Sequence, residues 1–243
     1  MRVEFTGQLG RKIPERRMIN STRPDLLHLR KITAIGSGSF HSFAIDAEGE
    51  VYAWGLNQYG QLGLETEVDA SGEEQRIIWT PTRIPELAPS ELSKDGWSNS
   101  RVVQISGGEH HTVFLLSDGR VYTAGRIDSS QLGLHSDHLR LKEAKEANHD
   151  YISIPTRVLL PPLPQEGKPN PDVDPMDEEE ETKTKVVKNS IAKVSAAGHG
   201  SLALSEEGYA YSWGLGASSQ VWTFVISNDL WGADGISTAW PWS

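Results

Sequence analysis

One pattern of strands and glycines recurs three times along the 243-residue chain, and it constrains the fold more than any other feature. The copies run over residues 31–64, 102–134 and 191–220. In each copy a turn glycine stands six residues before a second glycine, which stands six residues before a glutamine. The three sets are Gly49, Gly55 and Gln61, then Gly119, Gly125 and Gln131, then Gly208, Gly214 and Gln220. Because the spacing is free of gaps, the copies are repeats of one structural unit.

Each copy has the features of a small antiparallel sheet. Short runs of apolar, β-branched and aromatic residues predict strands. The pairs Glu48-Gly49, Asp118-Gly119 and Glu207-Gly208 favour tight hairpins, because glycine accepts a positive φ at low cost. Segments 80–85 and 154–159 share a Pro-Thr-Arg core and predict a further strand, which proline restricts to an outer edge. We therefore expect about four strands per copy.

A sheet of this kind cannot bury both faces alone, so the copies must stack on one another. Radial stacking gives a β-propeller, and linear stacking into a solenoid is the alternative. We predict an all-β fold, a partial β-propeller of four-stranded antiparallel blades. The positions of His41, His111 and Gly200 should then lie on equivalent inner strands.

The repeats also predict how the chain is divided. Residues 1–30 are the end of a truncated repeat, 31–100 a blade with a loop, 101–190 a blade with an acidic, proline-rich insert at 161–188, 191–222 a truncated third repeat, and 223–243 a tail without the repeat. The density of proline and glutamate in the insert predicts a solvated loop, with an acidic docking site as the alternative. Because the pattern stops at Trp222, we expect apolar blade faces to be left uncovered at both ends.

Composition restricts the classes of partner. The chain has 23 basic and 33 acidic residues, a formal net charge of −10, which argues against unspecific binding to nucleic acid or anionic lipid. No apolar run approaches the roughly 20 residues of a membrane helix, and the N-terminus lacks a secretory signal. We expect a soluble, intracellular protein that is not secreted and has no membrane contact. The absence of cysteine excludes disulfides and thiol nucleophiles.

Motifs of catalysis are missing from the sequence. It has no glycine-rich phosphate loop, no Gly-x-Ser-x-Gly and no His-x-x-x-His. We therefore expect no enzyme activity, catalytic residue, cofactor, metal or small-molecule substrate. The one weak metal candidate is His135 with His138, beside Asp137 in a charged loop.

The order of motifs resembles the repeat of the regulator of chromosome condensation family. Each copy follows or approaches Gly-x-x-His-(Ser/Thr), Glu/Asp-Gly, Val-Tyr-x-x-Gly and Gln-Leu-Gly, over residues 7–221, and kelch and WD repeats fit worse. Residues 7–15 and 106–112 are similar to the members that act as nuclear exchange factors for the GTPase Ran, and the long charged insert at 134–188 resembles that of fungal relatives. The resemblance implies a seven-bladed propeller, of which this chain is about half, and a nuclear location.

The resemblance further implies that the complete protein binds Ran and speeds release of guanine nucleotide. It assigns Arg11 and His110 to the GTPase-contacting side, whereas by themselves these are a surface arginine and a loop histidine. His41 and His111 are expected to be structural. No segment matches the family's acidic contact residues or basic tail, so chromatin contact is not expected from this chain. The alternative function is a non-exchanging propeller-repeat binding module or an inactive truncated product.

Overall fold

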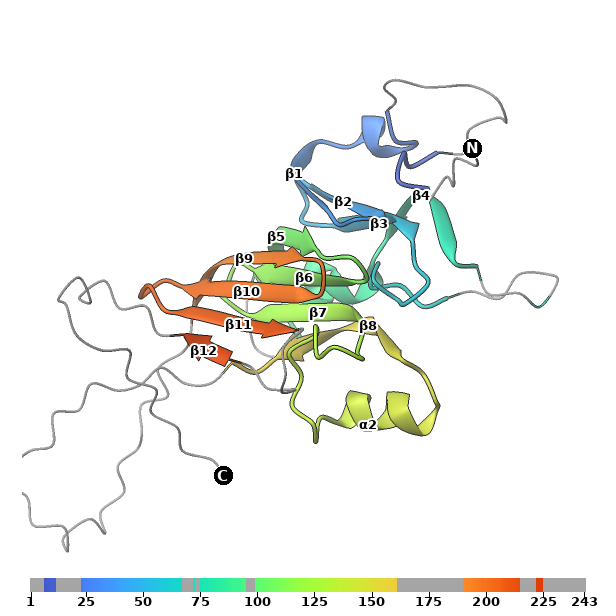
Figure 1. The fold of residues 1–243 in the computed structure, drawn as a ribbon. Coiled ribbons are helices and arrows are strands. Elements are labelled where there is room, and N and C mark those ends of the chain that lie inside the picture. Colours follow the sequence, from blue (N-terminus) through green and yellow to red (C-terminus); the bar gives the residue numbers. More distant parts are fainter. Residues whose placement is uncertain are drawn as a thin grey trace, which may run out of the picture.

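Three four-stranded antiparallel sheets make up the computed structural model (Figure 1). It describes residues 7–11, 23–66, 72, 75–94, 99–160 and 190–214, and the backbone of 222–224. The acidic insert at 161–188 and the tail from residue 225 lie outside the described residues.

Within each sheet the strands follow the order of the chain, which confirms the prediction of four strands per copy. Sheet 1 contains β1 (Ile32–Ser37), β2 (His41–Asp46), β3 (Val51–Leu56) and β4 (Ile77–Arg83). Sheet 2 contains β5 (Val102–Gly107), β6 (His111–Leu116), β7 (Val121–Arg126) and β8 (Tyr151–Val158). Sheet 3 contains β9 (Ile191–Ala197), β10 (Gly200–Ser205), β11 (Ala210–Gly214) and β12 (Trp222–Phe224).

Neighbouring sheets approach one another through their first strands, as blades do around a propeller axis. Strand β1 packs against β5, and β5 packs against β9. The fourth strands β4 and β8 lie at the outer edges and carry Pro81 and Pro155, as predicted. His41, His111 and Gly200 occupy equivalent positions, but each begins the second strand of its sheet, next to the innermost one.

The hydrophobic core lies between the sheets, and sheet 2 is therefore buried on both faces. Phe114 of β6 packs edge to face on Phe43 of sheet 1, with ring centroids 5.6 Å apart. The alternate residue Val113 joins the second cluster, together with Tyr211 and Trp213 of sheet 3. Because both faces are covered, every residue of β6 is buried, and the strand has a continuous apolar run instead of an alternating one.

Both outer faces of the array expose apolar side chains, as the repeat pattern predicted, although on sheet 1 Ala44 and Trp54 are covered by Leu27 and by the segment that carries Gln8. Ile35 of β1 is 80% exposed, whereas the equivalent Ile105 and Val194 of the next two sheets are 5% and 4% exposed. On the opposite side, Leu202 of β10 is 54% exposed, although its equivalent Phe43 is buried. Position in the array decides the burial of these residues, since the residue type is apolar throughout.

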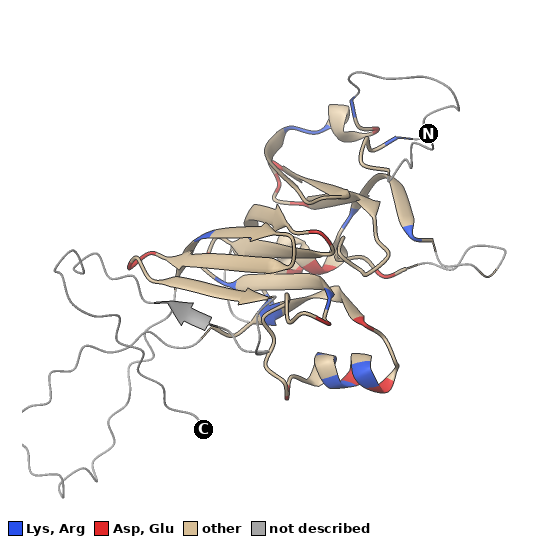
Figure 2. Ribbon diagram, viewed as in Figure 1, with Lys and Arg blue, Asp and Glu red and all other residues tan. Residues whose placement is uncertain are grey.

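Short helices precede the first strand and occupy two of the connections between strands. They are η1 (Leu27–Leu29), η2 (Pro85–Leu87), α1 (Pro89–Leu92) and α2 (Leu139–Glu146). His135 and His138 are expected from the sequence to lie in a charged loop, and α2, which begins at Leu139 with His138 as its N-cap, corrects this. The helix has no buried residue and carries charges of both signs, while charged residues elsewhere gather mainly in turns (Figure 2). None of the helices in the described segments is long and apolar enough to span a membrane.

Candidate functional site

The two ends of the sheets differ in their connections. Because successive strands are antiparallel, successive turns alternate between the two ends. One end, the loop end, carries turns 38–40, 57–60, 108–110, 127–130 and 198–199. The other, the hairpin end, carries the Glu/Asp-Gly turns of the three repeats and α1. Each end has a polar cluster, and the two clusters differ in burial.

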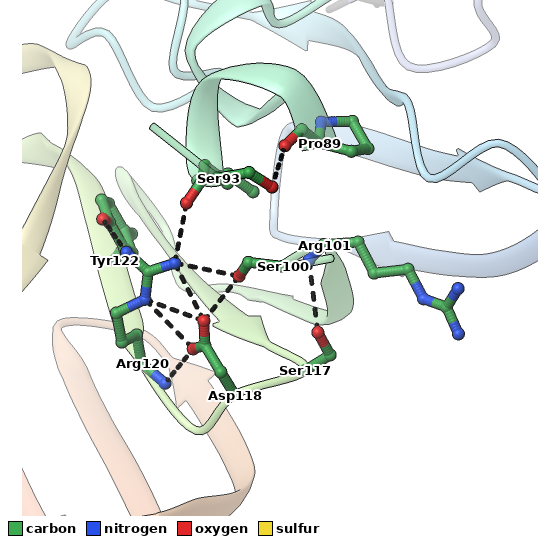
Figure 3. Close-up of polar contacts among 9 residues, drawn as sticks. Pro89, Ser93, Ser100, Arg101, Ser117, Asp118, Arg120 and Tyr122 are labelled. Atoms are coloured by element: carbon green, nitrogen blue, oxygen red, sulfur yellow. Dashed lines mark hydrogen bonds and ion pairs between the residues drawn. The ribbon is translucent and has the colours of Figure 1, made fainter. Parts of the chain in front are cut away.

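The hairpin-end cluster is centred on Arg120, which is only 5% exposed (Figure 3). Its Nε donates to both carboxylate oxygens of Asp118, at 3.1 and 3.0 Å, and its Nη2 donates to the carbonyl of Leu92 and to Ser100 Oγ, both at 3.0 Å. Burial raises the pKa of Asp118, but the hydrogen bonds from Arg120 and Ser100 outweigh it, so the pKa lies below its usual value. This arrangement fastens α1 to the β6–β7 hairpin and leaves little of Arg120 for a ligand.

Buried histidines link each sheet to the next. His41 Nε2 lies 2.9 Å from Thr112 Oγ1, and the Thr112 hydroxyl donates to the carbonyl of Gln61 at 2.7 Å. His111 Nε2 lies 2.7 Å from Ser201 Oγ, which is 3.3 Å from the carbonyl of Gln131. A hydroxyl has one proton to donate, so each histidine is the donor through Nε2.

The two linking histidines are fully buried and neutral. Burial lowers the pKa of His41 to about 3 and that of His111 to about 4. Their role is structural, as predicted, and the partner of each ring is a hydroxyl on the next sheet. The His-(Ser/Thr) and Gln-Leu-Gly motifs therefore occur together because they form one hydrogen-bonded connection between blades.

His110 lies at the loop end, in the turn between β5 and β6. Its ring is 4.8 Å from the ring of Tyr59 and 6.1 Å from that of Phe40, and both aromatic residues come from sheet 1. The guanidinium of Arg126 lies 4.6 Å from the centroid of Tyr59, and the Arg126 N–H donates to the His110 carbonyl at 2.9 Å. The His110 side chain keeps 16% of its surface exposed.

A carboxylate joins His110 to its equivalent in sheet 3. Glu109 Oε1 is 3.6 Å from His110 Nε2, and Glu109 Oε2 is 3.4 Å from His199 Nε2. Burial lowers the pKa of His110, and the positive charge of Arg126 acts in the same direction, while the negative charge of Glu109 opposes them. The loop end thus presents rings and a carboxylate drawn from all three sheets, which suits contact with another protein more than chemistry on a small molecule.

Arg11, the other predicted site residue, belongs to segment 7–11, which is held against sheet 1. Trp54 Nε1 donates to the carbonyl of Gln8 at 2.7 Å, and Gln8 Nε2 donates to the carbonyl of Ser39 at 2.9 Å. Because Ser39 is in the β1–β2 turn, Gln8 anchors this segment at the loop end three residues before Arg11, and the carbonyl of Gly10 accepts from the Asp25 N–H at 3.0 Å. Arg11 and His110 are therefore associated with different sheets, and the role of each in binding stays a prediction.

Sequence reasoning missed Tyr59, Phe40, Glu109 and Arg126. One signal was available, because Phe40, His110 and His199 hold the same repeat position and must line up along the loop end. The approach of Tyr59 to His110 was not predictable, since it depends on how the turn of one sheet reaches the next.

The residues considered for a metal form no such site. His135 Nδ1 contacts Asp137 Oδ1, while His138 Nδ1 accepts from the Arg140 N–H at 3.2 Å and caps α2. Over the described part of the chain, no three His, Asp or Glu side chains converge on a position for a metal ion.

Comparison with known proteins gives the repeat a name. The model of the regulator of chromosome condensation (RCC1) repeat matches residues 48–115, and a second model of the same description matches 32–61 and 102–131. Protein pim1 of Schizosaccharomyces pombe is 36% identical over 216 residues, which are 88% of this chain and 33% of that protein. Guanine nucleotide exchange factor SRM1 of Saccharomyces cerevisiae is 30% identical over 215 residues, 88% of this chain and 36% of that protein.

A solved structure agrees with these matches. The crystal structure of Prp20p from Saccharomyces cerevisiae, described with its binding properties to Gsp1p and histones, is 27% identical with a TM-score of 0.61. The match covers 92% of this chain and 44% of Prp20p. The chain spans about a third of the length of the two curated relatives. These matches confirm the predicted resemblance and the partial β-propeller.

Proposed function

This chain is built from regulator of chromosome condensation repeats, and from that premise we propose that it is part of a nuclear guanine-nucleotide exchange factor and contacts a Ran-type GTPase through its loop end. The similarity to SRM1, which is named a guanine nucleotide exchange factor, supports the activity. The position of His110 at the loop end supports the choice of this end as the contact surface. The role of the complete protein is protein binding that stimulates nucleotide release, without covalent chemistry.

The observation that carries this proposal is the construction of the loop end around His110. Side chains of all three sheets meet there, with Tyr59 and Phe40 from sheet 1, His110 and Glu109 from sheet 2, and His199 from sheet 3. Aromatic residues with a polar edge are enriched at protein interfaces, because they bury a large area at low conformational cost. The hairpin-end cluster at Arg120, by contrast, is closed by its own hydrogen bonds.

Exchange requires that the factor bind the nucleotide-free GTPase more tightly than the nucleotide-bound form. Contacts at the rim of an interface contribute on the order of 1 kcal/mol each, so displacement of a nucleotide needs many of them. Three blades supply part of such a surface. We therefore expect the 243-residue chain to bind Ran and to leave nucleotide release nearly unstimulated, which distinguishes a partial exchange surface from a complete one.

The test uses the full chain, purified Ran and a fluorescent guanine nucleotide. Affinity for nucleotide-free Ran should fall about tenfold in His110→Ala, and it should be unchanged in His28→Ala, a histidine exposed at the hairpin end. Equal affinities of His110→Ala and the unmodified chain would remove His110 from the surface. Rates of nucleotide release close to those produced by SRM1 would show that three blades suffice, and binding with equal affinity for both nucleotide states would favour the alternative, a non-exchanging binding module.

A further inference from the structure

Tyr59 is a turn residue of the loop end whose ring contacts two side chains of the neighbouring sheet. It belongs to the turn after β3 of sheet 1, yet its ring contacts His110 and Arg126 of sheet 2. Ser129 holds the equivalent position in sheet 2, two residues before the glutamine, and offers no ring to His199. The two histidines differ in exposure accordingly: the His199 side chain, without such a ring, is 31% exposed, and the His110 side chain is 16% exposed.

The turn that carries Tyr59 is fastened to sheet 2. The backbone N–H of Tyr59 donates to Gln61 Oε1 at 2.8 Å, and the carbonyl of Gln61 accepts from Thr112 of β6 at 2.7 Å. Gly60 passes so close to β8 that a Cβ there would lie 2.5 Å from Ser153 Cα. The position of the Tyr59 ring is thus determined by the packing of one blade on the next.

Arg126 completes the arrangement from the other sheet. Its guanidinium covers the ring of Tyr59, and its Nη2 is held by Asp128 Oδ2 at 2.7 Å. Its backbone N–H holds the carbonyl of His110. His110 is therefore restrained at its ring by Tyr59 and at its main chain by Arg126.

We infer that Tyr59 is a positioning residue, which holds the imidazole of His110 in the orientation that a GTPase would contact. The inference rests on the proposed function, because it takes His110 to be the contacting group. Tyr59 acts through His110 and not by touching the partner. An ordered ring loses less conformational freedom on binding than a mobile one, so the restraint raises affinity.

The experiment compares Tyr59→Leu, which removes the aromatic ring, with Tyr59→Phe, which keeps it, in the full chain, and Ser129→Ala is the matched control. Circular dichroism verifies folding of each variant. The first measurement is affinity for nucleotide-free Ran. We expect Tyr59→Leu to weaken binding about five- to tenfold, and Tyr59→Phe and Ser129→Ala to stay within about twofold of the unmodified chain. In a His110→Ala background, Tyr59→Leu should cause no further loss.

The second measurement does not need the GTPase. The His110 imidazole is titrated by nuclear magnetic resonance, with its signal assigned from the His110→Ala spectrum. The ring faces Glu109, Arg126, His199 and Asp128, and it is partly shielded by Tyr59 and Phe40. Loss of the Tyr59 ring admits water, so the pKa of His110 should rise toward its ordinary value in Tyr59→Leu and stay in place in Tyr59→Phe.

The outcomes separate the inference from the proposed function. Failure of every variant to bind Ran would sink the proposed function, and the titration would still show whether Tyr59 restrains His110. An unmoved pKa in Tyr59→Leu would overturn the positioning role. An equal loss of affinity from Tyr59→Leu with and without His110 would also overturn it, because Tyr59 would then contact the GTPase directly.

Discussion

At the scale of single residues, His41 and His111 show how separate motifs become one contact. Each imidazole donates to a hydroxyl of the next sheet, next to the carbonyl of a Gln-Leu-Gly turn. The arrangement works only with a neutral ring, because a charged imidazole would lose its hydration in the core. The third copy has Gly200 at this position, and that sheet cannot make the same bond to a further blade.

Acid should weaken these linkages. Burial lowers the folded-state pKa of His41 to about 3 and of His111 to about 4, so the unfolded chain binds these protons first as the pH falls. Their stabilisation is fully present above about pH 6.5 and is lost progressively as the pH falls toward about 4 for His111 and about 3 for His41. We predict that the free energy of unfolding falls by about 2 kcal/mol per histidine from pH 7 to pH 5, measured by urea unfolding. His111→Gln keeps a donor without the titration and should flatten this slope, and an unchanged slope would contradict the assignment.

Arg120 allows a comparison of buried and exposed ion pairs within one chain. Arg120→Ala removes the buried guanidinium that donates to Asp118, Ser100 and the carbonyl of Leu92, and Asp118 keeps the Ser100 hydroxyl and the N–H of residue 120 as donors. Because the buried carboxylate loses its cation, the substitution should lower the free energy of unfolding by about 3–5 kcal/mol. Arg83→Ala removes an exposed pair with Glu50 and should cost less than about 1 kcal/mol. Urea unfolding at neutral pH measures both, and similar losses would show that burial of the Arg120 cluster has been overestimated.

At the scale of elements, the turns after β3 and β7 matter as much as the strands. The turn 57–60 fixes Tyr59 over His110 and lies against β8, so it belongs as much to sheet 2 as to sheet 1. The Gln-Leu-Gly motif follows this turn directly in the sequence, but it could not predict which neighbour the turn contacts. Similarly, the charged segment 139–146 shows no apolar periodicity, and α2 forms there with only Leu141 and Ala144 partly buried against the core.

Gly60 tests how strongly this turn joins the two sheets. In Gly60→Ala, a Cβ would lie 2.5 Å from Ser153 Cα, in addition to the strain of a left-handed backbone with φ of 65°. Gly72→Ala is the control, because its φ is 84° and its surroundings are open. Strain alone costs about 1–2 kcal/mol, and the clash should add about 1–3 kcal/mol in Gly60→Ala only. Thermal unfolding should show a clearly lower Tm for Gly60→Ala than for Gly72→Ala. Equal Tm values would mean that the turn can shift away from β8 at little cost.

At the scale of the whole molecule, three sheets packed through their first strands form an array whose two outer faces expose apolar side chains. Ile35 and Leu202 mark these faces, while Ile105, the equivalent of Ile35, is buried between blades. The sequence predicted uncovered apolar side chains at both ends of the array, because the repeat positions show which residues of the three sheets are equivalent. It could not predict which side chains meet at the loop end, since contacts such as Tyr59 with His110 depend on the angle and distance between sheets and not on spacing along the chain.

The central claim is that the loop end, and not the hairpin end, contacts the GTPase. Hydrogen–deuterium exchange of the full chain, with and without nucleotide-free Ran, tests it most directly. We predict slower exchange on binding in turns 38–40, 57–60, 108–110 and 198–199, with turns 47–50, 117–120 and 206–209 unchanged. Protection of the hairpin-end turns with the loop end unchanged would contradict the account.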